Sequence, residues 1–336
     1  MRTGEIPVRT AVVTGASAGV GRAVAHALAR RGWQLGLIAR DAGALEAVRR
    51  EAEAAGAPQV RVAAIDVADA SAVFDAAGRF GRELGGIELW VNNAMVTVFG
   101  PVSALSPEEF RRVTEVTYLG YVHGTMAALR QMRAQDRGTI LQVGSALAYR
   151  AIPLQSAYCG AKFAIRGFTD ALRSELRHDG SRVRLTMVQL PAVNTPQFDW
   201  ARSHMPRRAQ PVPPIFQPDA VAEAVCRAAE TAPREVWVGW SGIRAIIGTM
   251  LAPGILDRLL ARQGYDGQMA PEARPPGQPD NLFAPVAGRH AGQGRFGAVA
   301  QPRVSAVNPA LLRGVMVAAL LVPAVVASRR LLRRGR

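Results

Sequence analysis

A glycine-rich turn between an apolar strand-like run and a helical pattern constrains the fold of this chain more than any other feature. Residues 9–14 predict a short buried strand, Thr14-Gly15-Ala16-Ser17-Ala18-Gly19-Val20-Gly21 follows, and residues 20–31 place apolar side chains at helical spacing. Glycines let a backbone approach a pyrophosphate, and a helix N-terminus adds N–H donors. Because the turn opens a strand–turn–helix unit, it predicts a dinucleotide site rather than tight packing alone.

The chain then alternates strand-like and helical segments up to residue 238. Strands are expected at 34–39, 60–65, 87–91, 139–143, 182–189 and 235–238, and helices at 42–55, 69–84, 107–134, 156–178 and 218–231. The strand-like runs are continuously apolar, as in strands that are buried on both faces. We therefore predict an α/β fold with a doubly wound, Rossmann-like parallel sheet and helices on both faces.

The chain contains a single lysine. Of the 41 Lys and Arg residues only Lys162 is a lysine, and it stands four residues after Tyr158. Codon bias toward arginine would leave one lysine by chance, but it does not explain this spacing. Residues i and i+4 of a helix share one face. Since Lys and Arg are not interchangeable beside a reacting group, the pair predicts a catalytic site.

Five motifs in this order resemble the short-chain dehydrogenase/reductase family over roughly residues 8–240. They are the Thr14–Gly21 turn, Asp66, Asn92-Asn93-Ala94, Ser145, and Tyr158-x-x-x-Lys162. The resemblance implies that Ser145, Tyr158 and Lys162 are catalytic, and that Lys162 also holds the nicotinamide ribose.

The chemistry of the pair agrees with that implication. A free tyrosine has a pKa of ~10 and is a poor base at neutral pH. An adjacent ammonium favours the phenolate, and an oxidised nicotinamide would add a second positive charge. A fall of about three units in the pKa of Tyr158 needs roughly 4 kcal/mol. Tyr158 would then donate a proton in reduction and accept one in oxidation, while Ser145 stabilises charge on the substrate oxygen.

The resemblance also implies a cofactor site at the carboxyl ends of the strands. Its expected members are Gly15, Ser17, Gly19, Val20, Gly21, Arg40, Asp66, Val67, Asn93, Tyr158, Lys162, Val193 and Thr195. Arg40 follows Ala39, which occupies the usual acidic position, and its guanidinium suits a 2′-phosphate. Asp41 weakens this preference because it could pair with Arg40, yet the sequence favours NADP over NAD. Asp66 is expected to hydrogen-bond the adenine, and the alternative interpretation is a helix N-cap.

Several residues near the cofactor depart from the family pattern. Thr117 replaces the asparagine that supports a proton relay to the lysine, largely through its backbone carbonyl, so we expect a fourth catalytic position with altered side-chain bonding. Met95 and Ala192 stand where glycines are common and make the pocket bulkier. Eight residues predict a hydrophobic pocket, although each could equally belong to the core: Met95, Val96, Leu147, Tyr149, Leu154, Val193, Phe198 and Trp200.

Three functions compete on these residues. The first is an NADP-dependent carbonyl reductase or alcohol dehydrogenase that acts on a hydrophobic ketone or secondary alcohol. The second is a catalytically weak dinucleotide-binding sensor or membrane scaffold, which intact Ser145, Tyr158 and Lys162 oppose. The third is an epimerase or dehydratase of the extended branch, which the tight glycine turn opposes. We prefer the first, and the resemblance implies homodimers or homotetramers formed through helices 107–134 and 156–178.

The composition and the periodicity of the sequence change after residue 264. We expect a catalytic domain over 1–264, a loosely structured arm over 265–309 with Phe283 and Phe296 as anchors, and an apolar, arginine-flanked tail helix over 310–336. The uncharged run 314–328 would span ~22 Å, which is short of a ~30 Å bilayer core. Since catalytic domain and terminal arginines both favour the cytoplasmic side, a helix on the inner membrane surface is preferred. Packing of the tail against a partner subunit stays open.

The composition of the chain limits the compartment, the partners and the metal sites that we expect. Two cysteines provide no disulfide framework, and no apolar signal segment precedes the first strand, so we expect a cytoplasmic protein. The net charge is +15, and residues 265–336 supply +7 of it from ten arginines and three acids. No nucleic-acid-binding signature accompanies this charge, so nucleic acid is not an expected partner. The five histidines lack metal-ligand spacing, so no metal is expected.

Overall fold

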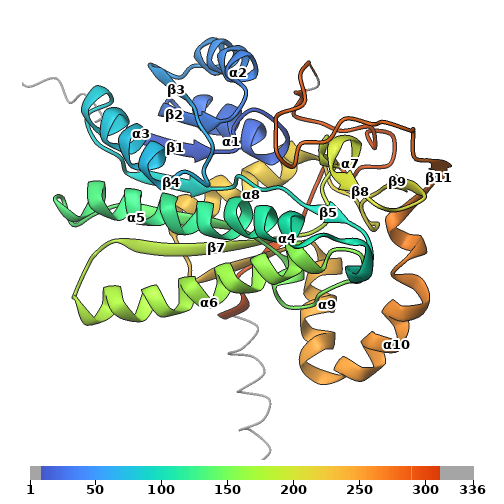
Figure 1. Ribbon diagram of the computed structural model, residues 1–336. Helices are drawn as coiled ribbons and strands as arrows, with labels where there is room; N and C mark the ends of the chain where they lie inside the picture. Colours follow the sequence, from blue (N-terminus) through green and yellow to red (C-terminus); the bar gives the residue numbers. More distant parts are fainter. Residues whose placement is uncertain (1–8, 289, 311–336) are drawn as a thin grey trace, which may run out of the picture.

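One central sheet organises the protein, as the computed structural model shows for residues 9–288 and 290–310. Its strand order is β12-β10-β7-β6-β4-β1-β2-β3 (Figure 1). The strands are β1 (Thr10–Thr14), β2 (Gln34–Ala39), β3 (Val60–Ala64), β4 (Leu89–Asn92), β6 (Thr139–Ser145), β7 (Arg184–Leu190), β10 (Glu235–Val238) and β12 (Ala306–Val307). All neighbours are parallel except β12, which runs antiparallel to β10. The predicted doubly wound α/β sheet is confirmed.

Helices cover both faces of this sheet. One face carries α1 (Gly19–Ala29), α2 (Ala42–Ala54) and α8 (Pro218–Thr231), and the other carries α3 (Ala70–Glu83), α4 (Pro107–Thr114), α5 (Gly120–Arg133) and α6 (Ser156–His178). Side chains alternate between the two cores along each strand. In β1, Ala11 and Val13 pack into the first core, whereas Val12 packs into the second. Burial on both faces explains why the strands are continuously apolar.

The helix expected at 107–134 is interrupted. Ser106 and Glu109 form a capping box at the start of α4, and a π-helical turn at Glu115–Leu119 separates α4 from α5. The prediction of one continuous helix is therefore wrong in this segment. A π-turn adds a residue to the helical repeat and so rotates the side chains that follow it.

The sheet reverses its winding between β1 and β4. Chain connections lead from β1 outward to β2 and β3, and then back to β4 on the other side of β1. Ligands in such sheets bind in the crevice at the carboxyl ends of the strands, where the winding reverses. This topology places the glycine turn after β1 next to Asn93 and Ala94 after β4.

Elements that the sequence did not predict extend this edge. They are α7 (Gln197–Trp200), α9 (Trp240–Leu251), α10 (Pro253–Gln263), and two strand pairs, β5 (Val98–Phe99) with β8 (Arg202–Ser203) and β9 (Arg207–Ala209) with β11 (Met269–Ala273). Helices α9 and α10 form a hairpin beside the sheet (Figure 1). Few of their apolar residues are buried, which weakens the helical pattern in the sequence.

The arm is more ordered than expected. It contains β11 and β12, and its backbone bonds to the catalytic domain at several points. Leu282 is fully buried in the core and anchors it, whereas the predicted anchor Phe283 is half exposed. The ring of Phe296 packs edge-on against that of Phe198, with 5.9 Å between the ring centres. The arm orders because it completes the sheet edge through β12 and inserts Leu282 into the core.

The predicted tail helix over 310–336 lies outside the described residues except for Ala310. Within the ranges 9–288 and 290–310, no helix combines the length and the apolar character needed to cross a bilayer.

Candidate active site

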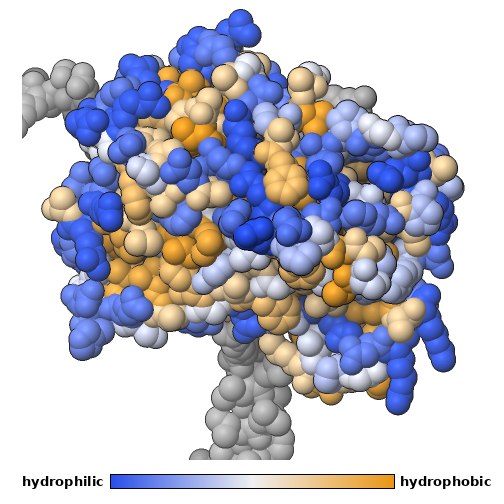
Figure 2. All heavy atoms as spheres, in the orientation of Figure 1, coloured by the Kyte–Doolittle hydropathy of each residue, from blue (hydrophilic) through white to orange (hydrophobic). Residues whose placement is uncertain are grey.

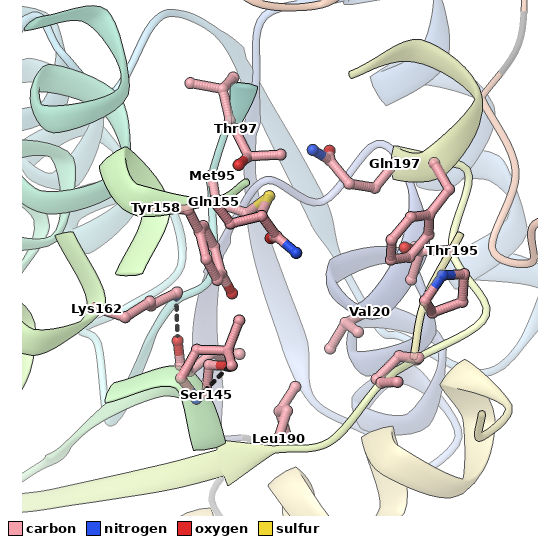
Figure 3. Close-up of a pocket in the computed structure, with 18 of the residues that line it drawn as sticks. Val20, Met95, Thr97, Ser145, Gln155, Tyr158, Lys162, Leu190, Thr195 and Gln197 are labelled. Carbon is pink, nitrogen blue, oxygen red and sulfur yellow. Dashed lines mark hydrogen bonds between the residues drawn. The ribbon is translucent and has the colours of Figure 1, made fainter. Parts of the chain in front are cut away.

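A cavity of about 590 Å³ lies at the carboxyl ends of the central strands. Its wall combines the glycine turn, the ends of β4, β6 and β7, the start of α6, helices α9 and α10, and part of the arm. Ser145, Tyr158 and Lys162 lie on one side of it, and Val20 and Thr195 lie across from them (Figure 3). Residues from distant parts of the sequence thus meet in one crevice.

The glycines of the turn leave no room for side chains. Gly15 has a φ of +66°, and a Cβ there would lie 2.7 Å from Ala94 Cα. A Cβ on Gly21 would lie 2.2 Å from the carbonyl oxygen of Gly15. The N-terminus of α1 therefore approaches the cavity closely, and Ser17 and Val20 line it. This bare backbone at a helix N-terminus fits a pyrophosphate, with the Gly19 N–H itself already donating to the Ala291 carbonyl (2.9 Å).

Asn93 supports the turn as well as lining the cavity. Its side-chain amide donates to the carbonyls of Thr14 (3.0 Å) and Gly15 (3.3 Å). On the far side, a Cβ on Gly19 would lie 3.1 Å from Thr195 Cγ2, so α1 also packs against the segment after β7. The turn is thus held between the ends of β4 and β7.

The three predicted catalytic residues come together. Ser145 ends β6, and Tyr158 and Lys162 lie one turn apart on α6. Lys162 Nζ donates to the Val143 carbonyl (2.8 Å) and to the Tyr121 hydroxyl (3.0 Å), and it lies 5.5 Å from the centre of the Tyr158 ring. These two hydrogen bonds fix the ammonium next to the phenol.

Burial controls the charges of this pair. It raises the pKa of the Tyr158 phenol above its ordinary value, and the neighbouring Ser145 hydroxyl only partly offsets the rise. Burial also lowers the pKa of the Lys162 ammonium to about 7. The expected lowering of the Tyr158 pKa by Lys162 does not appear in the protein alone, because loss of water disfavours both charged forms.

The side chain of Thr117 bonds to the backbone of the segment that follows β4. Its hydroxyl donates to the Val96 carbonyl (2.8 Å) and accepts from the Val96 N–H (3.0 Å), so its hydrogen is committed. Tyr121, one turn later, contacts Lys162 instead. No sequence pattern pointed to Tyr121, because the π-turn that precedes α5 changes which residues face Lys162.

At the opposite end of the cavity, Arg40 binds the arm. Its guanidinium donates to the carbonyls of Asn281 and Leu282, and burial lowers its pKa. Asp41 does not pair with Arg40. It caps α2 by accepting from the Ala44 N–H (2.8 Å).

Asp66 lines the same end of the cavity, together with Val67. Its carboxylate pairs with Arg112 and accepts from the Ala68 N–H (3.0 Å). The alternative interpretation of Asp66 as a helix N-cap is wrong, because Asp69 caps α3.

The remaining wall is largely apolar. Of the eight predicted pocket residues, six line the cavity: Met95, Val96, Leu147, Val193, Phe198 and Trp200. Tyr149 and Leu154 do not, since the Tyr149 hydroxyl bonds to the carboxylate of Glu235 and Leu154 packs beside Phe99. Sequence reasoning missed Leu256, Leu259 and Leu260 of α10. It also missed Gln155 and Gln197, which extend into the cavity (Figure 3).

Metal ligands do not gather anywhere in residues 9–288 and 290–310, where no group of three His, Cys, Asp or Glu side chains could hold an ion.

Comparisons with known proteins agree with this geometry. A family model described as short chain dehydrogenase matches residues 9–205. The uncharacterized oxidoreductase YxnA of Bacillus subtilis is 31% identical over 281 residues, which cover 83% of this chain and 79% of that protein. The dehydrogenase/reductase SDR family member 7B of Bos taurus is 33% identical over 56% of this chain and 59% of its own length.

Solved structures show the same fold. An alcohol dehydrogenase from the archaeon Thermococcus sibiricus, complexed with 5-hydroxy-NADP, aligns with a TM-score of 0.58 and 29% identity. The alignment covers 68% of this chain and 95% of that one. A short-chain dehydrogenase from Streptomyces avermitilis aligns with a TM-score of 0.64 at 21% identity, over 78% of this chain and 98% of its own.

Proposed function

We propose that this chain, which belongs to the short-chain dehydrogenase/reductase family, transfers hydride between NADP(H) and a hydrophobic ketone or secondary alcohol. The family membership supports NAD(P)-dependent oxidoreduction in general. The observation that carries the proposal is the meeting of Ser145, Tyr158 and Lys162 across one cavity from the bare glycine turn. A scaffold or sensor would have no use for this trio.

The nicotinamide would supply or accept the hydride. Tyr158 then gives its phenolic proton to the substrate oxygen in reduction and takes it back in oxidation. Ser145 donates a hydrogen bond to the same oxygen and stabilises charge there. Lys162 supplies the positive charge that favours the phenolate, and it binds the nicotinamide ribose. The backbone carbonyl of Thr117 would connect Lys162 to a proton relay. The Tyr121 hydroxyl donates to the Val143 carbonyl (2.9 Å) and accepts from Lys162, so it positions the ammonium instead.

NADP is preferred over NAD on the charge at the adenosine end. Arg40 lines that end of the cavity, and Asp41 is directed to the N-terminus of α2 instead of to Arg40. The guanidinium therefore forms no ion pair with Asp41 and donates to the carbonyls of Asn281 and Leu282. The cofactor-binding set proposed from the sequence is retained: Gly15, Ser17, Gly19, Val20, Gly21, Arg40, Asp66, Val67, Asn93, Val193 and Thr195 line the cavity or support its wall.

A hydrophobic substrate is supported by the apolar part of the cavity wall. Met95, Leu147 and Phe198 line the cavity, and leucines of α10 extend its apolar surface. Gln197 offers a polar contact, because its Nε2 is buried and makes no hydrogen bond within the described part of the chain. A mostly apolar cavity with few polar groups is typical of small-molecule sites.

The test is a hydride-transfer assay with NADPH and NADH over a panel of ketones, comparing the wild type with Tyr158→Phe. We expect reduction of apolar ketones with NADPH and a loss of at least about 100-fold in kcat for the variant, because the proton donor is removed. Thermal shift with NADP and NAD should show that the variant still folds and binds cofactor. Equal turnover by both proteins would refute the assigned mechanism.

We also propose a homo-oligomer formed through α4 to α6. Apolar side chains gather over α5 and α6 on the face that Figure 2 shows. Leu119, Met126 and Phe163 are between 36% and 44% exposed there.

We further propose that the protein is cytoplasmic and that its tail lies at the inner membrane surface.

A further inference from the structure

The arm forms the outer wall of the cavity at its adenosine end. Asn281, Pro285, Val286 and His290 all line it. The carbonyl of Ala291 accepts a hydrogen bond from the Gly19 N–H (2.9 Å) at the start of α1. The described residues 281–288 and 290–291 therefore extend from Arg40, at the end of β2, to the N-terminus of the first helix.

Among the described arm residues that line this cavity, only His290 has a titratable side chain. Its side chain is 12% exposed, and its ring packs against that of Trp200 with 5.4 Å between the ring centres. Both ring nitrogens are buried and neither makes a hydrogen bond within the described part of the chain. A buried polar group without a hydrogen bond is destabilising, so this imidazole is suited to a ligand.

The charges around the ring identify the kind of ligand. His290 Nε2 lies 3.2 Å from Asp41 Oδ2, close but without the alignment of a hydrogen bond. Arg40 lines the same end of the cavity, and the Arg22 guanidinium donates to the backbone carbonyl of His290 (3.0 Å). An imidazolium carries two N–H donors, so one can face Asp41 while the other faces an anion. It would also offset the carboxylate that otherwise repels a phosphate.

We propose that His290 is a cofactor-binding residue, and that it recognises the adenosine 2′-phosphate of NADP(H) together with Arg40. This assignment rests on the proposed function. The arm also sets the position of Arg40, because the carbonyls of Asn281 and Leu282 hold its guanidinium. Cofactor selectivity is thus shared between the second strand and a segment about 250 residues later in the chain.

The experiment compares the binding of 2′,5′-ADP and of 5′-AMP by calorimetry, with the full chain as wild type, His290→Ala and His178→Ala. These two ligands differ only in the 2′-phosphate. We expect His290→Ala to weaken 2′,5′-ADP binding about tenfold, the effect of one charge-assisted hydrogen bond, and to leave 5′-AMP binding unchanged. His178 is exposed at the end of α6, so its variant should match the wild type.

Thermal unfolding of each variant shows whether the fold is kept. An equal loss for both ligands, or no loss for either, would overturn the role of His290 while leaving the dinucleotide function intact. If the wild type binds neither ligand, the proposed function fails and this assignment fails with it.

Discussion

Lys162 is the residue on which the proposed chemistry depends most. It is 2% exposed, and both of its hydrogen bonds join it to groups that the fold holds rigidly, the Val143 carbonyl and the Tyr121 hydroxyl. A guanidinium is planar and carries five donors, so it cannot occupy this site with the same bonds. A chain that uses arginine elsewhere therefore has a physical reason to keep an ammonium here.

Replacing Lys162 by arginine should lower kcat/KM about 100-fold although the charge is kept. The loss reflects hydrogen bonds to a charged group, each of which contributes about 1.5–3 kcal/mol. Steady-state kinetics measures it, with Arg177→Lys at an exposed position of the same helix as control. Normal activity in Lys162→Arg would mean that the single lysine reflects codon usage alone.

The pH dependence of kcat/KM, compared between the wild type and Lys162→Arg, distinguishes the effect of the charge at position 162 from the effect of its geometry. Burial lowers the pKa of Lys162 to about 7, so the ammonium is charged below that pH and loses its proton above it. The kcat/KM of the wild type for ketone reduction should therefore fall as the pH rises through about 7. The residual activity of Lys162→Arg should lack this descending limb, since a guanidinium stays charged. An identical limb in both proteins would assign it to another group.

At the scale of elements, Gly294 determines how closely the arm approaches the site. Its N–H donates to the Asn194 carbonyl (3.1 Å), and a Cβ there would lie 2.4 Å from the carbonyl oxygen of Thr195. No flexible side chain could move away to relieve that contact. The neighbouring Gly297 has open space around its Cα, so the two glycines form a matched pair.

Gly294→Ala should displace the arm and weaken NADPH binding about tenfold, whereas Gly297→Ala should bind as the wild type does. The reason is that the displaced arm loses its contacts near Gly19 and Arg40. Fluorescence titration measures the affinity, and hydrogen exchange of segment 281–296 reports the displacement. If both alanine variants bind equally well, the arm does not contribute to the cofactor site.

At the scale of the whole molecule, the catalytic domain and the tail follow different physical rules. The domain buries two cores around its sheet. Residues 314–328 are uncharged and apolar, and five arginines follow them. Near an anionic membrane each arginine contributes about 1 kcal/mol, and the apolar run adds buried area.

Removal of residues 310–336 should release the protein from the membrane fraction without loss of ketone reduction. Vesicles with and without anionic lipid would test the charge contribution, and substitution of the terminal arginines by glutamine is the matched control. Unchanged partitioning of the truncated protein would exclude the anchor and favour packing of the tail against a partner subunit.

Sequence reasoning went furthest where chemistry lies in local spacing. The glycine turn, Ser145, and the Tyr158–Lys162 pair are recognisable because a short segment places each of them. The doubly wound arrangement of the parallel sheet followed from the alternating periods and from right-handed crossovers. Helices α9 and α10 escaped prediction because most of their apolar residues are not buried in a core.

What the sequence by itself determined is therefore the sheet, the turn and the set of Ser145, Tyr158 and Lys162 that we propose to handle the proton. Only the tertiary structure decided that Tyr121 contacts Lys162, that Leu282 anchors the arm, and that His290 faces the same cavity as Arg40. The reason is physical: these contacts join segments far apart in the chain, and a π-turn and a two-residue strand set their register. Neither feature has a period that a sequence pattern can reveal.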